Sequence, residues 1–398
     1  MRTSITHPKA TATATTTTTT TATTTTRAAA ALATGCVGLL LVLTGCDSSS
    51  AADPAPSAAD AAADAKNGDS VPVLAIPVPR GEGSRVPYDF NGDGHPDLVI
   101  NDLVQAPEDP HGDDAGPGIV YGTEDSPLDP AARRLLNARA NAAKSGDTLP
   151  AAFDAEAVCD LDRDGFTDLI VSTDPPYNGV GAPPVPLQIL FGSPEGLTGK
   201  AVTVRIPAQA RVGKEWPEHP VCGDFDGDGS TDLAVTASDG RISFLRGPFA
   251  RTGTPAGATL LPDGAPYLYA PEPKADTDGD GYDDLVATAR SRTPGKAAEG
   301  TLLLGSADGP AHPGGAYTFP PEKLPEAPLR TKNTKATKAT EGTTRTTLLS
   351  HGDFDGDKKA DTVVRTTYRG GREDLVALYA AGNTDDPVLT FSTALFLP

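Results

Sequence analysis

The most regular pattern along the chain is an acidic stretch followed at once by a short apolar run. From Cys222 to Val235 the sequence CGDFDGDGSTDLAV places aspartates at alternate positions, then a glycine, another aspartate and three apolar residues. An apolar run of this kind, bounded by turn residues, is typical of a buried strand. The pattern occurs five times, so we predict five buried strands that each follow an acidic loop.

The five loops share the same oxygen-bearing positions. Counted from the first aspartate, positions 1, 3, 5 and 9 carry Asp or Asn in every copy, and position 6 is glycine in four copies but Lys358 in the fifth. We number the loops 1 to 5 in chain order; they span residues 89–97, 160–168, 224–232, 276–284 and 353–361.

This spacing suits calcium, because Ca²⁺ takes about six to eight oxygen ligands and a tightly coiled loop brings alternate side chains to one centre. Glycine at position 6 allows the sharp turn after which position 7 presents its backbone carbonyl. Lys358 removes that glycine and adds positive charge, so loop 5 should bind calcium more weakly. The predicted ligands are Asp89, Asn91, Asp93, His95 and Asp97; Asp160, Asp162, Asp164, Phe166 and Asp168; Asp224, Asp226, Asp228, Ser230 and Asp232; Asp276, Asp278, Asp280, Tyr282 and Asp284; and Asp353, Asp355, Asp357, Lys359 and Asp361.

The loops differ from EF-hands, which need a glutamate at position 12 and flanking helices. Position 12 is instead apolar, as in Val171 and Val235, and lies within the predicted strand. A single Asp/Gly turn could bind nothing. Five copies with the same oxygen positions favour about four to five structural calcium sites.

A second marker recurs between the loops, an apolar strand that often ends in a glycine turn, as in LQILFGSPEGL from Leu187. The acidic loop and the FGSPEG segment together resemble the FG-GAP or VCBS repeat, the blade unit of integrin-α-like β-propellers. The resemblance covers residues 71–398. It implies an all-β propeller of four-stranded antiparallel blades, with the calcium loop joining strands inside a blade.

The number of loops favours five blades, although six or seven blades remain open if some lack a loop. The apolar segment Val71–Val78 is expected to complete the last sheet and close the ring. A helix is expected over Ala131–Lys144, after Asp129 and Pro130. The basic run Arg330–Arg345 is expected to be a mobile loop, with contact to an anionic surface polymer as the alternative. The single tryptophan, Trp216, is expected to pack against a loop.

The N-terminal region is predicted to be an export signal. Residues 1–45 combine a basic, threonine-rich start with a short apolar stretch, and Leu43-Thr44-Gly45-Cys46 resembles the lipobox of bacterial lipoproteins. That resemblance implies lipidation of Cys46; an ordinary signal peptide is the alternative. Residues 46–70 contain no large apolar residue and are predicted to be a flexible tether. The domain would then be anchored to the outer face of the cell membrane.

Two cysteines remain in the predicted domain, Cys159 and Cys222. An exported pair could form a disulfide. Their positions relative to the acidic loops differ by one residue, so their side chains should point to opposite faces of their sheets. On that ground we predict two buried free thiols rather than a disulfide.

The formal net charge of −20 argues against nucleic acid as a partner and against direct binding to an anionic membrane, other than through the lipid. The sequence shows no nucleophile elbow, zinc-protease motif or phosphate-binding glycine loop. We therefore expect a monomeric, non-catalytic surface lipoprotein that binds an extracellular protein or glycan. The alternatives are a hydrolase or lyase with a site at the propeller axis, and a scaffold with no ligand beyond calcium.

Overall fold

The computed structural model describes residues 74–103, 115–237, 239–293, 296–321, 323–325, 344–368 and 374–396, all within one compact unit, Ala55–Pro398. The predicted signal peptide, Cys46, the tether and most of the basic run lie outside these residues. Within the described part of the chain, no helix has the length and apolar character needed to cross a membrane.

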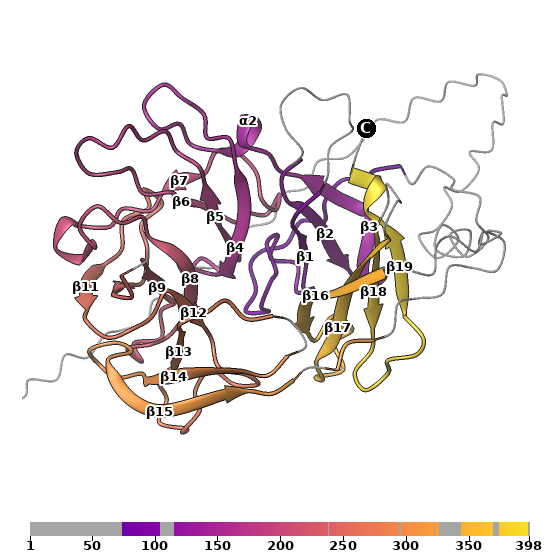
Figure 1. Ribbon diagram of the computed structural model, residues 1–398. Coiled ribbons are helices and arrows are strands. Elements are labelled where there is room, and N and C mark those ends of the chain that lie inside the picture. Colours follow the sequence, from indigo (N-terminus) through magenta and orange to yellow (C-terminus); the bar gives the residue numbers. More distant parts are fainter. Residues whose placement is uncertain are drawn as a thin grey trace, which may run out of the picture. The chain divides into compact units, whose positions relative to one another are not determined.

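The described chain folds into five antiparallel sheets, each made from strands that are consecutive in sequence (Figure 1). Each sheet is one blade of a propeller, as predicted. Blade 1 contains β1 (Leu98–Ile100), β2 (Gly118–Thr123) and β3 (Ser126–Leu135); blade 2 contains β4 (Phe153–Cys159), β5 (Asp168–Thr173), β6 (Leu187–Leu190) and β7 (Val202–Thr203). Blade 3 contains β8 (Glu218–Gly223), β9 (Asp232–Thr236), β10 (Ile242–Arg246) and β11 (Gly257–Leu261). Blade 4 contains β12 (Tyr267–Tyr269), β13 (Leu285–Thr288), β14 (Ala298–Leu304) and β15 (His312–Phe319); blade 5 contains β16 (Thr344–Gly352), β17 (Asp361–Tyr368), β18 (Leu375–Tyr379) and β19 (Leu389–Ser392).

The hydrophobic core lies between neighbouring blades. The strand that follows each acidic loop has consecutive apolar residues and is therefore apolar on both faces, since successive side chains point to opposite sides of a sheet. Leu169 and Val171 of β5 pack in a cluster shared with blade 1, whereas Ile170 between them packs in a cluster shared with blade 3. Similar clusters join blade 3 to blade 4 and blade 5 to blade 1. This two-sided burial explains why the strand after each acidic loop is a continuous apolar run.

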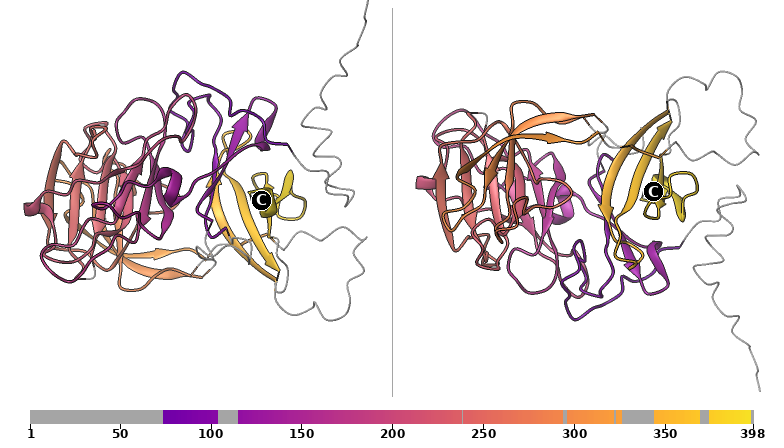
Figure 2. Two further views of the ribbon diagram at one scale, coloured as in Figure 1. Left: turned by 90° about the horizontal axis from the view of Figure 1, so that it is seen from above. Right: turned by 90° about the horizontal axis from the view of Figure 1, so that it is seen from below.

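Blade 5 and blade 1 lie side by side although they come from opposite ends of the chain (Figures 1 and 2). Their shared cluster includes Leu98, Ile100, Phe354 and Phe391. Arg365 of β17 also reaches across, and its guanidinium donates to the backbone carbonyls of Asn101 at 2.7 Å and Asp102 at 2.9 Å. The blades thus continue from the last to the first.

The prediction that the N-terminal segment completes the last sheet is wrong. Blade 5 takes all four of its strands from Thr344–Ser392, and the segment instead lies along blade 1, where Ile76 N–H donates to the Ala131 carbonyl of β3 at 3.0 Å. Prolines in this segment lack the N–H that a regular strand pair requires. Blade 1 consequently has three strands, without one before its acidic loop.

The predicted helix over Ala131–Lys144 is also wrong. Its first half is part of β3, and the helix that forms, α2 (Ala138–Asn141), is capped by Asn137 rather than Asp129. Two arginines explain the strand, because each reaches a neighbouring blade. Arg133 Nε donates to the Leu395 carbonyl and Arg134 Nη1 to the Leu197 carbonyl, both at 2.9 Å.

Cys159 and Cys222 form a disulfide with a Cα–Cα distance of 6.4 Å, so the prediction of two free thiols is wrong. The two residues do point to opposite faces of their own sheets: Cys159 pairs with Asp168, whereas Gly223, not Cys222, pairs with Asp232. The sheets, however, are neighbouring blades, and one face of blade 2 packs against the opposite face of blade 3. Side chains on opposite faces therefore meet in the core cluster between these blades.

Candidate metal centres

Four of the acidic loops join the first and second strands of a blade, as the resemblance implied, and loop 1 precedes β1 directly. The aspartate at position 1 closes each loop by accepting a hydrogen bond from the backbone N–H at position 6. The donors are Gly94, Gly165, Gly229, Gly281 and Lys358, at 2.7–3.1 Å.

The aspartate at position 5 makes the second repeated contact, since it accepts from the backbone N–H of position 7 in all five loops at 2.7–3.0 Å. Position 6 has a left-handed backbone in every loop. Its φ is 86° at Gly165 and 66° at Lys358. Loop 5 therefore adopts the same turn as the others, but with a residue for which this conformation is strained.

Several oxygens in the loops are buried without a hydrogen-bond partner. They are Oδ1 of Asn91, Asp160, Asp162, Asp224 and Asp353, which occupy position 1 or position 3. A buried carboxylate or amide oxygen without a partner is costly. A cation between positions 1 and 3 would satisfy them, so the residues present fit a bound calcium ion in loops 1, 2, 3 and 5.

The carboxylates also converge. In loops 2 and 3 the oxygens of positions 1, 3 and 9 lie within 4.8 Å of one another, and in loops 4 and 5 those of positions 1, 3 and 5 do so. In loop 1 the amide of Asn91 stands at position 3, and it donates to Asp93 at 2.9 Å. Hard oxygen donors of this kind suit Ca²⁺ rather than a softer metal.

The aspartate at position 9 has a structural role that the sequence did not suggest. One of its oxygens accepts from the backbone N–H of position 2, at 2.8–3.1 Å in every loop. The other accepts at 2.8–3.0 Å from an N–H near or just after the end of the next strand, which is β2 in blade 1 and the third strand in blades 2 to 5. These donors are Gly122, Gly192, Gly247, Gly305 and Ala381.

The glycine at this place in blades 1 to 4 is needed for space. A Cβ at Gly122, Gly192, Gly247 or Gly305 would overlap the carbonyl oxygen of position 8 of the same blade's loop. The Phe-Gly pair at Phe191 and Gly192 was therefore the available sequence signal for this contact. Blade 5 has Ala381 at this place, and Lys358 in its loop.

Neighbouring loops contact one another through positions 4 and 7. A Cβ on Gly92 or Gly227, both at position 4, would overlap the ring at position 7 of the next loop, Phe166 or Tyr282. In loop 2 position 4 is instead Arg163, and position 7 of loop 3 is the small Ser230, which accepts from the Arg163 guanidinium at 3.3 Å. The side chain at position 7 is thus matched to the preceding loop, while its backbone carbonyl remains the predicted ligand.

Burial is the largest influence on the pKa values of the buried loop aspartates. It raises the pKa of Asp97 and Asp168 well above the usual range, that of Asp232 to about 7 and that of Asp162 to about 6. Neighbouring aspartates act in the same direction. The loops therefore hold carboxylates whose charge is not compensated by the protein alone, and a divalent cation would provide that compensation.

Cationic side chains approach three loops. Arg251, after β10, binds Asp162 with Nε at 2.7 Å and Asp164 with Nη2. Arg246 binds Asp226 at 2.6 Å, and Lys359 binds Asp357 at 2.7 Å, which lowers the pKa of Asp357. Neither arginine could be predicted from the loop motif, because each comes from a different blade or a later strand than the loop it contacts.

Five antiparallel sheets in a ring, each with an aspartate-rich loop that leads into one of its strands, make this protein a β-propeller with candidate cation sites. Residues 224–287, from the start of loop 3 into β13, match the family model of the FG-GAP-like repeat. The protein is thus an FG-GAP repeat β-propeller. No match is found among curated proteins.

Proposed function

We propose that this protein is a cell-surface lipoprotein whose calcium-stabilised propeller binds an extracellular protein or glycan without altering it. The unpartnered buried oxygens of the loops carry this proposal, because they favour a fold that depends on a cation. Extracellular calcium modules bind with dissociation constants of about 10⁻⁴–10⁻³ M, so such loops would be filled outside the cell. The disulfide between Cys159 and Cys222 supports export, since disulfides persist in oxidising compartments.

The lipid anchor rests on the sequence Leu43-Thr44-Gly45-Cys46. Mass spectrometry of the membrane fraction should find diacylglyceryl on Cys46 at the mature N-terminus. Cys46→Ala should block maturation or release the protein. An unmodified mature N-terminus at another residue would contradict the anchor, while the ligand-binding role would stand.

Calcium removal tests the structural part of the proposal. At a concentration ten times its dissociation constant, a ligand that binds only the folded state adds about 1.4 kcal/mol per site. Four filled sites would then add about 6 kcal/mol, comparable with the whole stability of many domains. The melting temperature of the full chain should fall by many degrees with a chelator and recover with calcium. Magnesium should restore little, since it prefers a smaller shell that keeps several waters.

The binding role is tested with ligands of both classes. The full chain, immobilised in 2 mM calcium (about the upper end of the expected range), is exposed to purified glycans and to a displayed library of random peptides. We expect a ligand that binds saturably, is released when a chelator is added and is recovered chemically unchanged. Retention of no glycan and no peptide would contradict the proposal.

An enzyme is the second candidate, because one specific observation favours it. Two glutamates, Glu156 within β4 and Glu218 at the start of β8, line the same cavity. Paired carboxylates serve as acid and base in glycoside hydrolysis. Recovery of a captured glycan as shorter fragments would favour the enzyme, and loss of that cleavage in Glu156→Gln and Glu218→Gln would assign it.

A further inference from the structure

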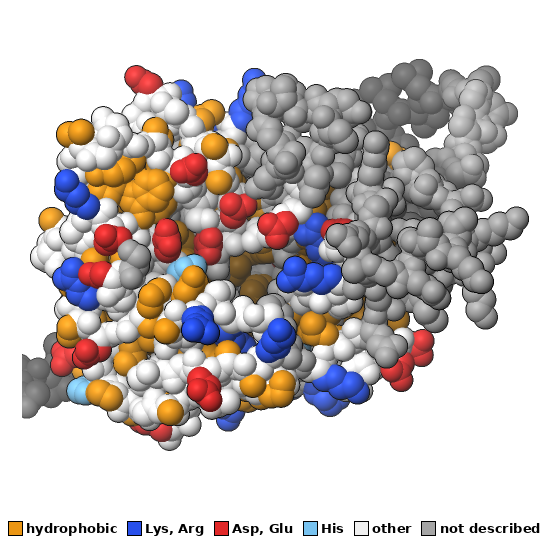
Figure 3. All heavy atoms as spheres, in the orientation of Figure 1, with side chains coloured by type: hydrophobic (Ala, Val, Ile, Leu, Met, Phe, Trp, Pro, Cys, Tyr) orange, Lys and Arg blue, Asp and Glu red, His pale blue; other side chains and the backbone are white. Residues whose placement is uncertain are grey.

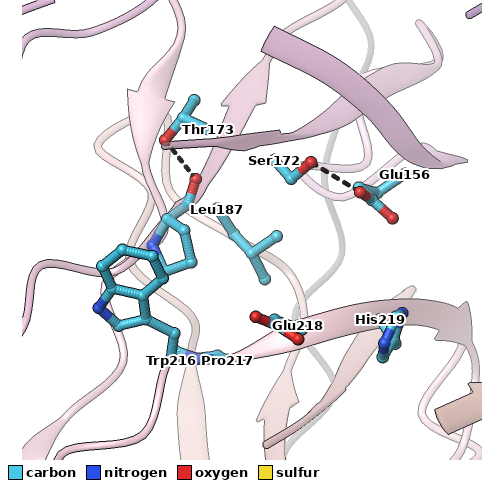
Figure 4. A pocket seen from close by; sticks show the side chains of 9 residues that line it. Glu156, Ser172, Thr173, Leu187, Trp216, Pro217, Glu218 and His219 are labelled. Atoms are coloured by element: carbon cyan, nitrogen blue, oxygen red, sulfur yellow. Dashed lines mark hydrogen bonds between the residues drawn. The ribbon is translucent and has the colours of Figure 1, made fainter. Parts of the chain in front are cut away.

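The cavity of about 280 Å³ lies between blades 2 and 3. It lies away from the metal loops: Ser172 and Thr173 end the strand that begins at Asp168 of loop 2, and Glu218 begins the strand that leads to loop 3. Figure 4 shows Glu156 and Glu218 on different strands beside this space, with Leu187 between them and the Trp216 indole at one side.

Irregular backbone at the innermost strands brings the polar groups to this cavity. β4 has a bulge at Glu156, and β8 has one between Glu218 and Val221. Blade 5 has a corresponding bulge at Leu349, whose apolar side chain packs against the core. Blade 2 therefore places a charged residue at a position where blade 5 places a core residue, and bulges of this kind can re-aim a side chain toward a site.

His219 adds a second irregularity. Its φ is 51°, in the left-handed region that a histidine seldom adopts, and its ring lies against Tyr267 of β12 with centroids 4.7 Å apart. Backbone strain of this kind clusters at binding and catalytic sites. The contact with Tyr267 connects the rim of the cavity to blade 4.

The chemistry of the cavity favours a cation. Both glutamates are exposed; among the described residues the Glu218 carboxylate has no hydrogen bond or ion pair, and Glu156 accepts only from the Ser172 hydroxyl, at 2.6 Å. Trp216 offers an aromatic face beside them, and a cation is attracted to such a face. The formal net charge of the chain is −20, and acidic side chains gather in a row across the face drawn in Figure 3.

The shape favours an extended segment. A second hollow of about 370 Å³ shares Trp216 and Glu218 with the first and continues along Tyr177 and Lys214. Tyr177 and Trp216 have ring centroids 6.3 Å apart, and the nearby Val180 is 77% exposed. A run of aromatic and aliphatic surface next to a charged cavity fits a peptide whose neighbouring side chains differ in polarity.

From these contacts we infer that the cavity between Glu156, Glu218 and Trp216 binds a lysine or arginine side chain presented by an extended segment of a protein partner. This inference rests on the proposed binding function and assigns its ligand to a protein. The ammonium or guanidinium group would lie against the Trp216 indole and beside Glu218, with Glu156 on the other side of Leu187 (Figure 4). The rest of the segment would follow the second hollow past Tyr177.

Trp216 provides the readout, because it is the chain's single tryptophan. The calcium-loaded full chain is titrated with a capped Ser-Ala-Lys-Ala-Ser peptide, its acetyl-lysine counterpart and glucosamine, and the Trp216 fluorescence is followed. We expect a saturable change with the lysine peptide that weakens with added salt. The acetyl-lysine peptide, which has lost the charge, should bind at least tenfold more weakly.

Substitutions localise the effect. Glu218→Gln and Glu156→Gln should each lower the affinity for the lysine peptide by roughly tenfold, which corresponds to about 1.4 kcal/mol of binding free energy. The matched control is Glu299→Gln, an exposed strand glutamate of β14 that lies outside the cavity, and it should leave binding unchanged. Unchanged melting temperatures in calcium show that each variant is folded.

Equal binding of the acetylated peptide, or equal binding by Glu218→Gln, would overturn the cationic site. Binding of glucosamine but not of the peptide would overturn the assignment to a protein segment. If the Glu156→Gln/Glu218→Gln double variant still retains a ligand from the glycan or peptide panel, the binding function stands and this cavity is not its site. If the unaltered chain retains nothing, the proposed function itself fails.

Discussion

Asp168 and Gly192 are joined across blade 2 by a hydrogen bond in which Asp168 Oδ1 lies 2.9 Å from the backbone nitrogen of Gly192. The other oxygen of the same carboxylate holds Leu161 N–H at 2.9 Å, so one side chain fixes both the start of the acidic loop and the end of the third strand. The equivalent contacts occur in every blade. The position-9 aspartate is thus part of the blade's framework as well as a predicted ligand.

We expect Gly192→Ala to destabilise the calcium-loaded protein by about 1–3 kcal/mol, the usual cost of overpacking. The added Cβ would overlap the carbonyl oxygen of Thr167. Gly352→Ala is the matched control, because its Cβ would meet only the Phe354 ring at an ordinary 3.4 Å. Thermal denaturation measures both. Equal melting temperatures for the two variants would show that the close approach at Gly192 is not tight.

The disulfide should be a substantial source of stability. It joins residues separated by 63 positions, and closing a long loop restricts the unfolded chain, typically by about 2–4 kcal/mol. Cys159→Ala/Cys222→Ala should therefore lower the melting temperature clearly. Reductant should lower the melting temperature of the natural chain to a similar value but leave the melting temperature of the double variant unchanged. A reductant effect on both proteins would point to other cysteines.

The sequence predicted the acidic loops and the strands after them because both are local patterns. A strand that is buried on both faces, such as Leu169–Val171, is apolar without interruption, and the loop oxygens recur at fixed spacing. Even Lys358 takes the loop's left-handed turn, so the pattern of oxygens decides the local fold more than any single residue does.

Two of the incorrect predictions, the helix and the free thiols, concern contacts between blades. Ala131–Leu135 form a strand because Arg133 and Arg134 reach the two neighbouring blades, which the helical spacing of the sequence does not reveal. Cys159 and Cys222 meet because opposite faces of adjacent sheets pack together. Arg251 reaches loop 2 from blade 3. The cavity glutamates were missed for the same reason, since Glu156 and Glu218 come from different blades.

Lys358→Gly should increase calcium binding at loop 5. The substitution keeps the left-handed turn but removes its strain, which costs a non-glycine residue about 1 kcal/mol, and it removes a positive charge beside the site. Lys358→Gln separates the two effects, because it removes the charge but keeps the strained turn. Calorimetric titration should rank the affinity of loop 5 as glycine above glutamine above lysine. Equal affinities in all three proteins would contradict the importance of position 6.

Arg251→Gln should have opposite effects in the absence and presence of calcium. Without metal, Arg251 partly neutralises Asp162 and Asp164, and its loss should cost up to about 1 kcal/mol, as for a half-exposed ion pair. With metal, the guanidinium competes for the same oxygens, so the variant should bind calcium more tightly at loop 2. Arg241→Gln, which breaks an ion pair with Asp239 beyond the end of β9 opposite loop 3, is the control. Weaker calcium binding in Arg251→Gln would show that the arginine supports the site instead.

The metal-free protein should lose stability as the pH rises from about 4 to about 7. Burial raises the pKa of Asp232 to about 7 and that of Asp162 to about 6, from an ordinary value of 3.8. The folded state therefore binds these protons more tightly than the unfolded state, and stability falls with pH until the folded carboxyls have ionised. Calcium should oppose this trend, since it binds the ionised carboxylates. The measurement is the melting temperature at pH 5, 6 and 7.5 in metal-depleted buffer, with and without calcium.

The Asp232→Asn variant is the control: its side chain does not titrate, so its metal-free melting temperature should depend less on pH. A metal-free melting temperature that rises between pH 5 and 7.5 would mean that the loop carboxylates are already compensated by the protein, and calcium would then be expected to add little.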